Sequence, residues 1–467
     1  MSDRARAISP LDGRYAGHVG ELGEWFSELA LVRARCQVEL AFVQALTSTG
    51  APGLPGRLTA DEDARIEALS RNFGEAEFAR VKELEALTRH DVKAVELFLR
   101  ESLRLERPNL IHLGLTSEDV NNLAYGLMLD GFRRKAQIPA LVRLLELLVE
   151  LAAKWKASPF PARTHGQLAT PTTAGKELAV FLHRLLPDLE TLLGFRFPGK
   201  LNGATGNYSA FVATYPRFDW PRLSEGFVRS LGLTFNPLTT QIESHDGLAR
   251  YLDLARHTNN IVLDLDLDVW LYVSHGYFRQ RTKTGEVGSS TMPHKVNPIR
   301  FENSEGNLEL SNALLTKMSD KLTRSRMQRD LSDSTVLRNL GVALGHAHLG
   351  ILEATKGLRE LELDPEVTRA ELDGHPELLA EPIQTILRAY GADDPYEQMK
   401  ALTRGRVVSR DALIGAVEAL PLPEEARAQC RLLAPSTYLG LAEKLTDEAL
   451  ERARGVLRSV STRISRG

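Results

Sequence analysis

Long stretches with the apolar spacing of α-helices occupy the middle of this chain, and they constrain its fold more than any other feature. They run from Ile138 to Trp155, from 254 to 272, from 301 to about 321 and from about 334 to 358. In the first stretch the apolar residues recur every three or four positions: Ile138, Leu141, Leu145, Leu148, Ala152 and Trp155. This is the period of a helix face, and Pro139 predicts either the first turn of the helix or a kink.

The composition agrees with a helical protein. Aromatic residues make up only 6% of the chain, which favours Leu- and Ala-rich helices over sheets. Strand signals are limited to short pieces around Phe235 to Ile242. We therefore predict an all-α fold with a bundle of long helices. Because these helices are apolar on two sides, we expect helices from several subunits to share one core.

Breaks in the helical pattern predict three helical domains. Residues 1–115 contain a helix face from Glu24 to Leu46 and further helices, one of them from Glu75 to Leu103. Residues 116–363 hold the long helices of the bundle. From residue 364 onward, prolines and glycines separate short helices, which predicts a C-terminal domain over residues 364–467.

Charge and cysteine content restrict the partners of this chain. Lys and Arg number 58 and Asp and Glu 61, so the net charge is −3, and no dense basic run indicates a nucleic-acid partner. Cys36 and Cys430 lack the spacing of a metal site or a disulfide framework. The N-terminus and the apolar stretches lack a targeting segment or a membrane span. We expect a cytoplasmic protein that binds a small molecule, without nucleic-acid or membrane partners.

The stretch from Gly285 to Pro298, GEVGSSTMPHKVNP, has the composition of a loop that carries chemistry. Glycines and prolines interrupt it, two hydroxyls follow Gly288, and His294, Lys295 and Asn297 supply hydrogen-bond donors. Such a loop can close over an anion. A plain solvated loop that caps the next helix explains the same composition.

Eleven consecutive residues, GSSTMPHKVNP, resemble the loop of the fumarase and aspartase superfamily, whose members break a C–N or C–O bond by β-elimination and release fumarate. The following segment Ile299–Asn307, IRFENSEGN, is similar to the bacterial adenylosuccinate lyases in particular. The similarity extends from Ser9–Tyr15 (SPLDGRY) to Ala380–Thr385 (AEPIQT).

The resemblance implies a homotetramer with a central helical bundle and with active sites shared between subunits. It implies cleavage of a nucleotide substrate, adenylosuccinate, into AMP and fumarate, and the parallel cleavage of succinylaminoimidazole-carboxamide ribotide. No cofactor and no metal is implied.

The chemistry that the resemblance implies rests on a few side chains. His165, in RTHGQLATPT, would be the general acid, because imidazole transfers protons near neutral pH; a single His without this motif is more often structural. Ser289 matches the general base, which requires backbone N–H groups and a nearby cation. Lys295 and Asn297 would stabilise the developing aci-carboxylate, and Ser290 would support them by hydrogen bonding.

The segment TSEDVNN, from Thr116 to Asn122, has the pattern of a helix start. Thr116 or Ser117 can cap the helix, and the acidic residues after them favour its dipole. The same hydroxyl and amide groups can bind a carboxylate, and the resemblance assigns Thr116 and Ser117 to a succinyl carboxylate. In TRHDVKAVE it implies three more residues that face the substrate: Arg89, His90 and Asp91.

A nucleotide substrate also needs a phosphate clamp and base contacts. Arginine suits phosphate because its planar fork donates two hydrogen bonds. Each candidate alone is more often a surface residue, and only the resemblance assigns them jointly to the substrate. They are Arg14, Tyr15, Gln241, Val296, Asn303, Arg329, Ser334, Thr335, Val336, Leu337 and Arg338.

Other functions compete with this interpretation. A Ser/His hydrolase would also use Ser289 and His165, but it needs a G-x-S-x-G elbow, which the sequence lacks. Dinucleotide and P-loop fingerprints are absent as well. A non-catalytic scaffold of the same fold is an alternative, which the presence of His165, Ser289, Lys295 and Asn297 disfavours. Argininosuccinate lyase and fumarase are the nearest alternatives within the superfamily.

Overall fold

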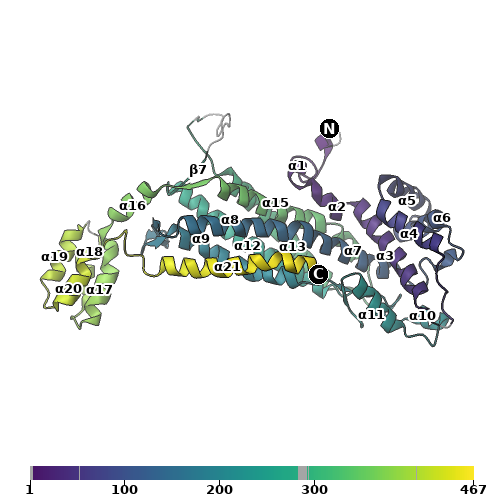
Figure 1. The fold of residues 1–467 in the computed structure, drawn as a ribbon. Coiled ribbons are helices and arrows are strands. Elements are labelled where there is room, and N and C mark those ends of the chain that lie inside the picture. Colours follow the sequence, from purple (N-terminus) through teal and green to yellow (C-terminus); the bar gives the residue numbers. More distant parts are fainter. Residues whose placement is uncertain (1–3, 52, 282–291, 293, 406–407, 467) are drawn as a thin grey trace.

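Long helices lie alongside one another in the computed structural model and form the centre of an elongated molecule (Figure 1). The structure describes residues 4–51, 53–281, 292, 294–405 and 408–466. The bundle helices are α8 (Ile138–Lys154), α9 (Ala174–Gly194), α12 (Asp246–Ser274), α13 (Ile299–Leu322), α15 (Leu340–Arg359) and α21 (Ala442–Arg466). The predicted all-α class is confirmed.

The helix that opens the bundle is longer than the sequence pattern indicated. Helix α7 (Ser117–Phe132), a π-helical turn (Arg133–Gln137) and α8 follow one another without a break. They contain 16, 5 and 17 residues, so at 1.5 Å per residue they extend over on the order of 55 Å. Pro139 lies in the first turn of α8, as predicted, directly after the π-helical turn.

Two stretches predicted as single helices are each divided. Residues 75–103 form α5 (Glu75–Thr88) and α6 (Asp91–Leu103). Arg89 ends α5 in the left-handed conformation, at φ 52°, which a repeating helix cannot include. The stretch from about 334 to 358 was likewise predicted as one helix. It contains two, α14 (Ser332–Leu337) and α15.

The N-terminal helices have a core of their own. It includes Val32 and Val43 of α3 (Glu28–Ser48), Ile66 of α4 (Ala60–Asn72) and buried residues of α5 and α6. The opposite face of α3 packs on α7. The short helices α1 (Ala16–Val19) and α2 (Gly23–Phe26) connect this region to the bundle.

The C-terminal third of the chain contributes to two cores. Residues between Leu379 and Cys430 form a separate small core. Its helices are α17 (Ala380–Ala389), α18 (Pro395–Thr403), α19 (Arg410–Glu418) and α20 (Glu424–Arg431), and α16 (Pro365–Asp373) leads into them. Helix α21 then returns along α8 and α9 (Figure 1) and places Leu450 and Ala453 in the central core. The division at residue 364 stays a prediction.

Short strand pairs occur at the ends of the bundle. The antiparallel pairs are β1 (Pro159–Phe160) with β4 (Thr172–Thr173), β2 (Arg163–Thr164) with β3 (Gln167–Leu168), and β7 (Phe278–Gln280) with β8 (Leu361–Leu363); β5 (Pro198–Gly199) pairs in parallel with β6 (Thr234–Phe235). Only the first residue of the predicted strand region 235–242 is in a strand. Helices α10 (Ser209–Thr214) and α11 (Trp220–Ser230) lie between β5 and β6.

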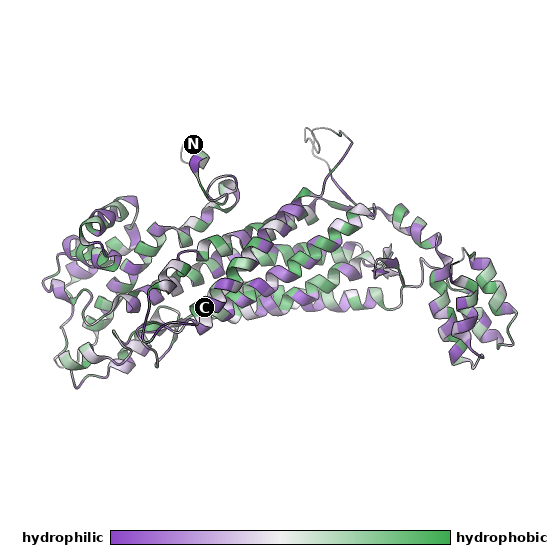
Figure 2. Ribbon diagram, turned by 180° about the vertical axis from the view of Figure 1, so that it is seen from behind, coloured by the Kyte–Doolittle hydropathy of each residue, from purple (hydrophilic) through white to green (hydrophobic). Residues whose placement is uncertain are grey.

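Some large apolar side chains of the bundle lie on its surface. Figure 2 shows that hydrophobic and hydrophilic residues alternate along the bundle helices. On α12 and α13, five large apolar side chains are exposed: Leu267 at 48%, Trp270 at 40%, Leu271 at 47%, Ile299 at 50% and Leu310 at 57%. No helix in the described part of the chain combines the length and apolar character needed to cross a membrane.

Candidate active site

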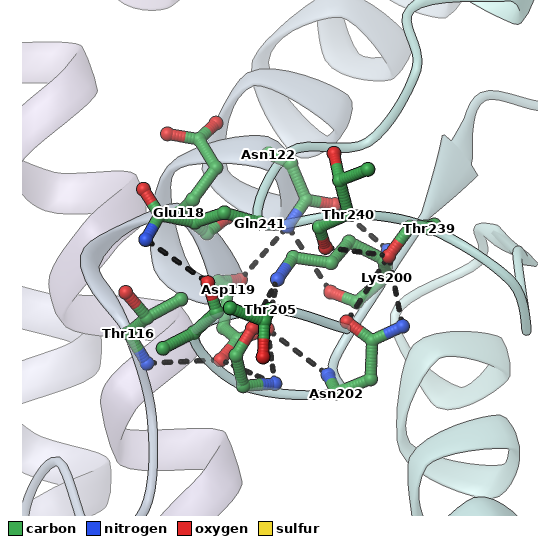
Figure 3. Close-up of polar contacts among 12 residues, drawn as sticks. Thr116, Glu118, Asp119, Asn122, Lys200, Asn202, Thr205, Thr239, Thr240 and Gln241 are labelled. Carbon is green, nitrogen blue, oxygen red and sulfur yellow. Dashed lines mark hydrogen bonds and ion pairs between the residues drawn. The ribbon is translucent and has the colours of Figure 1, made fainter. Parts of the chain in front are cut away.

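A fully buried ion pair holds the start of α7 (Figure 3). The side chains of Asp119 and Lys200 are 0% exposed, and Lys200 Nζ lies 2.8 Å from Asp119 Oδ1. The carboxylate also accepts hydrogen bonds from the backbone N–H of Thr116 at 2.9 Å and of Asn202 at 3.0 Å. Since a buried charge is unfavourable without a partner, these contacts fix Thr116 firmly against the loop that follows β5.

Amide side chains connect further loops to this ion pair (Figure 3). Asn122 Oδ1 accepts from the backbone N–H of Lys200 at 2.8 Å, and Asn122 Nδ2 donates to the backbone carbonyl of Lys200 at 3.1 Å. Gln241 Nε2 donates to the carbonyl of Ala204 at 3.0 Å. The predicted substrate residue Gln241 therefore lies beside the start of α7, in the region of Thr116.

Arg329 joins Gln241 to the first turn of α7. Its Nη1 donates to Gln241 Oε1 at 3.3 Å, and its Nη2 lies 3.1 Å from Glu118 Oε2. The Arg329 side chain is 18% exposed, whereas that of Glu118 is 2% exposed. Burial raises the pKa of Glu118 above its ordinary value, although Arg329 and His245 counteract this effect. The predicted residues Gln241 and Arg329 thus meet, and they do so around a carboxylate that the sequence pattern indicated only as a helix-dipole residue.

Asp91 connects the N-terminal region to the segment after α14. Arg35 Nη2 lies 2.8 Å from Asp91 Oδ2, and Arg338 Nη2 lies 3.3 Å from the same oxygen. Burial raises the pKa of Asp91, but the two arginines and a backbone hydrogen bond outweigh burial, so the pKa lies below its ordinary value. The structure therefore brings together the predicted residues Asp91 and Arg338. Arg89 and His90 are exposed at the turn between α5 and α6.

The predicted run from Ser334 to Arg338 covers the end of α14. The Ser334 backbone N–H donates to Asp333 Oδ1 at 2.7 Å. Arg338 borders a cavity of about 330 Å³ whose other wall is the N-terminal segment from Ser9 to Ser27. Along the run, Leu337 is buried, Ser334 and Val336 are half-buried, and Thr335 and Arg338 are exposed.

His112 is a polar residue near the start of α7 that the sequence analysis missed. Its Nδ1 lies 2.5 Å from Glu39 Oε1, its backbone N–H donates to Glu39 Oε2 at 3.1 Å, and Glu39 is fully buried. Burial lowers the pKa of His112, but Glu39 outweighs burial and the pKa is raised. The backbone of His112 is left-handed, at φ 63°. The two residues are 73 positions apart, so no sequence spacing could have indicated this pair.

A second group of predicted residues lies at the first turns of α13. Tyr15 Oη donates to Asn303 Oδ1 at 3.2 Å, and Asn307 Nδ2 donates to the same oxygen at 2.8 Å. His346 Nδ1 lies 2.8 Å from Asn307 Oδ1. The guanidinium of Arg14 lies 6.0 Å from the centre of the Tyr15 ring. The N-terminal segment and α13 therefore present Tyr15 and Asn303 together.

The predicted loop residues precede α13. Lys295 and Val296 are exposed, and Asn297 is half-buried. Ser289 and Ser290 lie outside the described residues, so their predicted roles are not placed. Among the residues that the structure describes, no group of three or more His, Cys, Asp or Glu side chains could hold a metal ion.

His165 lies far from the start of α7 within the same chain. It is exposed, with a left-handed backbone at φ 54°, and Gly166 follows at φ 75° in the turn between β2 and β3. Arg163, in this hairpin, donates to Tyr277 Oη at 3.2 Å and pairs with Glu371 of α16. The hairpin follows the end of α8, whereas Thr116 precedes the start of α7. The continuous helix between them separates the two by on the order of 50 Å.

Known families and proteins match almost the whole chain. A family model described as lyase matches residues 13–310, and one described as adenylosuccinate lyase C-terminal matches residues 325–439. The chain is 45% identical to the adenylosuccinate lyase of Haemophilus influenzae and 46% identical to that of Escherichia coli strain K12, in each case over 95% of this chain and 98% of the relative.

Solved structures with low sequence identity share the fold. A fumarate lyase from Mesorhizobium sp. BNC1 superposes with a TM-score of 0.75 at 21% identity, over 92% of this chain and 97% of that one. A 3-carboxy-cis,cis-muconate lactonizing enzyme from Pseudomonas putida gives a TM-score of 0.73 at 21% identity, over 94% and 97% of the two chains.

The helical bundle and the matched lyase model define this chain as a member of the fumarase and aspartase superfamily of lyases. Within that superfamily, the chain belongs to the adenylosuccinate lyase family. The resemblance carried by the loop GSSTMPHKVNP is thereby confirmed.

Proposed function

We propose that this chain is a C–N lyase that cleaves adenylosuccinate into AMP and fumarate. The observation that carries this conclusion is the identity of 45% and 46% over 95% of the chain with proteins named adenylosuccinate lyase. Succinylaminoimidazole-carboxamide ribotide carries the same succinyl group on nitrogen, and it is the second substrate that we propose.

The proposed reaction is a β-elimination. Ser289 removes a proton from the carbon next to a carboxylate of the succinyl group, and Lys295 and Asn297 stabilise the aci-carboxylate that forms. The C–N bond then breaks, a carbon–carbon double bond forms, and fumarate leaves. His165 protonates the departing nitrogen. The abstracted proton stays on Ser289, and the electrons of the broken C–H bond form the carbon–carbon double bond. The electron pair of the broken C–N bond leaves on the nucleotide nitrogen, where it receives the proton of His165.

The binding groups that we propose are those that the described residues bring together. Thr116 and Ser117 present their hydroxyl groups at the start of α7, where the helix dipole favours an anion. Arg329 lies 3.1 Å from Glu118 in the first turn of α7, and Arg338 borders the cavity beside the N-terminal segment. Arginine at these positions suits the carboxylate and phosphate groups of the nucleotide.

We propose that each active site takes residues from several copies of a homotetramer. Within one chain, the His165 hairpin and the start of α7 lie on the order of 50 Å apart, which is too far for one small substrate. Exposed apolar side chains on α12 and α13, among them Trp270 and Leu310, supply a surface that a second copy can bury.

We also propose a cytoplasmic location. Cys36 and Cys430 are buried free thiols, which suits a reducing compartment.

The substrate is tested by incubating the purified protein separately with adenylosuccinate, argininosuccinate, malate and aspartate and measuring fumarate. We expect fumarate from adenylosuccinate. Fumarate from one of the other three and none from adenylosuccinate would exclude the proposed function in favour of another lyase of the superfamily. No fumarate from any of them would indicate a non-catalytic scaffold.

The base is tested with a pair of neighbouring variants. Ser289→Ala should lower turnover by more than roughly a hundredfold, the contribution of a positioned general base. Ser290→Ala should retain most of the activity. If Ser290→Ala is the inactive variant and Ser289→Ala is active, the two roles are reversed.

The shared site is tested by mixing two inactive variants, His165→Ala and Ser289→Ala. After dissociation and random reassembly in equal amounts, a site receives each intact residue with a probability of one half, so roughly a quarter of sites should work if the residues come from separate chains. Native mass spectrometry verifies the mixed oligomers. Verified mixed oligomers without recovered activity would show that one chain supplies both residues.

A further inference from the structure

Two side chains hold the guanidinium of Arg329: the neutral amide of Gln241 and the carboxylate of Glu118. Gln241 Oε1 accepts a hydrogen bond from Nη1 at 3.3 Å, and Glu118 Oε2 lies 3.1 Å from Nη2. Gln241 is itself fixed, because its backbone N–H donates to the carbonyl of Gln328 at 3.3 Å and its side chain donates to the carbonyl of Ala204. The plane of the guanidinium is therefore defined before any ligand arrives.

Glu118, the charged partner of Arg329, is a buried carboxylate. It is 2% exposed, and its Oε1 has no hydrogen-bond partner among the described residues. A buried carboxylate depends on nearby positive charge to stay ionised. Arg329 supplies that charge. If another anion binds to Arg329, the guanidinium stabilises the ionised form of Glu118 less.

The charged groups around Glu118 come from several elements. Arg329 lies before α14, His245 precedes α12, and Asp333 belongs to α14; Tyr125 lies on α7 itself. Burial has the largest effect on the pKa of Glu118 and raises it, Arg329 and His245 lower it, and Asp333 raises it further. His245 Nε2 lies 4.0 Å from Asp333 Oδ2, so His245 interacts with the carboxylate of Asp333 as well as with that of Glu118. Arg329 is therefore the main support of the charge on Glu118.

We propose that Glu118 is the positioning residue of Arg329, and that an anionic group of the substrate, on binding to Arg329, causes Glu118 to take up a proton from solvent. This inference rests on the proposed function, because it assigns Arg329 to the substrate. A second anion on the same guanidinium competes with Glu118 for its hydrogen bonds and repels the carboxylate. Protonation of a Glu118 oxygen relieves the repulsion and leaves a neutral acid in a buried site, where the neutral form is favoured.

The pH dependence follows from this coupling. Anion binding raises the proton affinity of Glu118, so by linkage the protonated enzyme binds the anion more tightly. The dissociation constant should therefore increase as the pH rises through the titration of Glu118. In Glu118→Gln this contribution disappears, while the amide oxygen can still accept from Arg329.

The experiment is calorimetric titration of the full-length protein with AMP and, in a separate arm, with fumarate. Each titration is performed at one pH in two buffers of different ionisation enthalpy, which gives the number of protons exchanged on binding. AMP offers phosphate and fumarate offers carboxylate, so the arm that responds identifies the anion. Glu67→Gln, from an exposed ion pair with Arg71 on α4, is the matched control.

We expect the wild-type protein and Glu67→Gln to take up more protons than Glu118→Gln in at least one arm. Equal proton uptake by wild type and Glu118→Gln in both arms overturns the inference, as does the failure of both anions to bind. Neither result depends on fumarate production, so the proposed function is judged separately by the substrate panel.

The positioning role has its own readout in the steady-state kinetics. Glu118→Ala should raise the KM for adenylosuccinate by roughly tenfold, the value of a charge-assisted hydrogen bond, with a smaller effect on kcat. Glu118→Gln should restore the KM. Equal losses in Glu118→Ala and Glu118→Gln would assign Glu118 an ionic role without positioning. If Glu118→Gln does not fold, Glu118→Asp, which keeps the titrating group but shortens its reach, should retain proton uptake and show the raised KM.

Discussion

The start of α7 and the β2–β3 hairpin carry different parts of the proposed site, and they are held in opposite ways. At the start of α7, Asp119 and Lys200 are 0% exposed and bonded to several loops. At the hairpin, His165 and Gly166 are exposed. The ion pair of the first region is held by contacts within its own chain. The second region is an exposed hairpin. This arrangement is expected if the hairpin completes an active site on another copy of the chain.

This contrast predicts that the two regions respond to mutation in different measurements. Replacing the exposed His165 side chain at the hairpin should affect catalysis and leave folding intact. A change at the buried ion pair should affect folding first, because water cannot replace the lost partner.

The largest expected effect concerns His165→Asn. Asparagine tolerates the left-handed backbone at φ 54° but cannot transfer a proton, so turnover should fall by roughly 10²–10⁴-fold. The free energy of unfolding should change by less than about 0.5 kcal/mol, as at other exposed positions. Steady-state kinetics and urea unfolding at one protein concentration measure the two quantities. A large loss of stability would show that the hairpin is structural, and full activity would remove His165 from the mechanism.

The next effect concerns Lys200→Met. Removing the cation leaves Asp119 buried without its charge partner, which should cost about 3–5 kcal/mol of stability. Lys82→Met is the matched control, because Lys82 pairs with Glu28 and Glu85 while 37% exposed and should lose less than about 1 kcal/mol.

A double variant sharpens the test of this ion pair. Lys200→Met combined with Asp119→Asn leaves no lone charge and should recover part of the loss. If the double variant is no more stable than Lys200→Met, charge burial is not the cause of the loss.

The smallest effect is expected at Gly166, and it is compared with Gly206, a glycine of almost the same φ. Gly166, at φ +75°, has nothing within 4 Å of an added Cβ, whereas at Gly206, at φ +76°, the Cβ would lie 2.1 Å from the carbonyl oxygen of Thr239. Gly166→Ala should therefore lower the free energy of unfolding by about 1–2 kcal/mol, because a residue with a Cβ is strained in the left-handed conformation. Gly206→Ala should lower the free energy of unfolding by about 1–3 kcal/mol more, because the backbone at Thr239 must shift to make room for the Cβ. Thermal unfolding compares the two, and equal losses would contradict the difference in packing.

The helical pattern of the sequence predicted the bundle well and its interruptions poorly. The spacing from Ile138 to Trp155 matches α8, because a buried helix face repeats its apolar residues locally. The division between α5 and α6 was missed because Arg89 has no glycine-like signal, although it takes the left-handed conformation there. The acidic residues after Thr116 lie in the first turn of α7, as predicted, and Asp119 accepts from the Thr116 backbone N–H. The pattern did not indicate that Asp119 and Glu118 are also buried partners of Lys200 and Arg329.

By itself the sequence determined the all-α class and, through the loop GSSTMPHKVNP, the family to which the chain belongs. Only the tertiary structure decided that Lys200 lies against Asp119, that Glu39 holds His112 from 73 positions away, and that His165 is remote from Thr116. The physical reason is that periodicity and motifs are local properties of a chain. A buried ion pair, in contrast, forms only when distant segments pack and exclude water, and helix periodicity does not specify which segments meet.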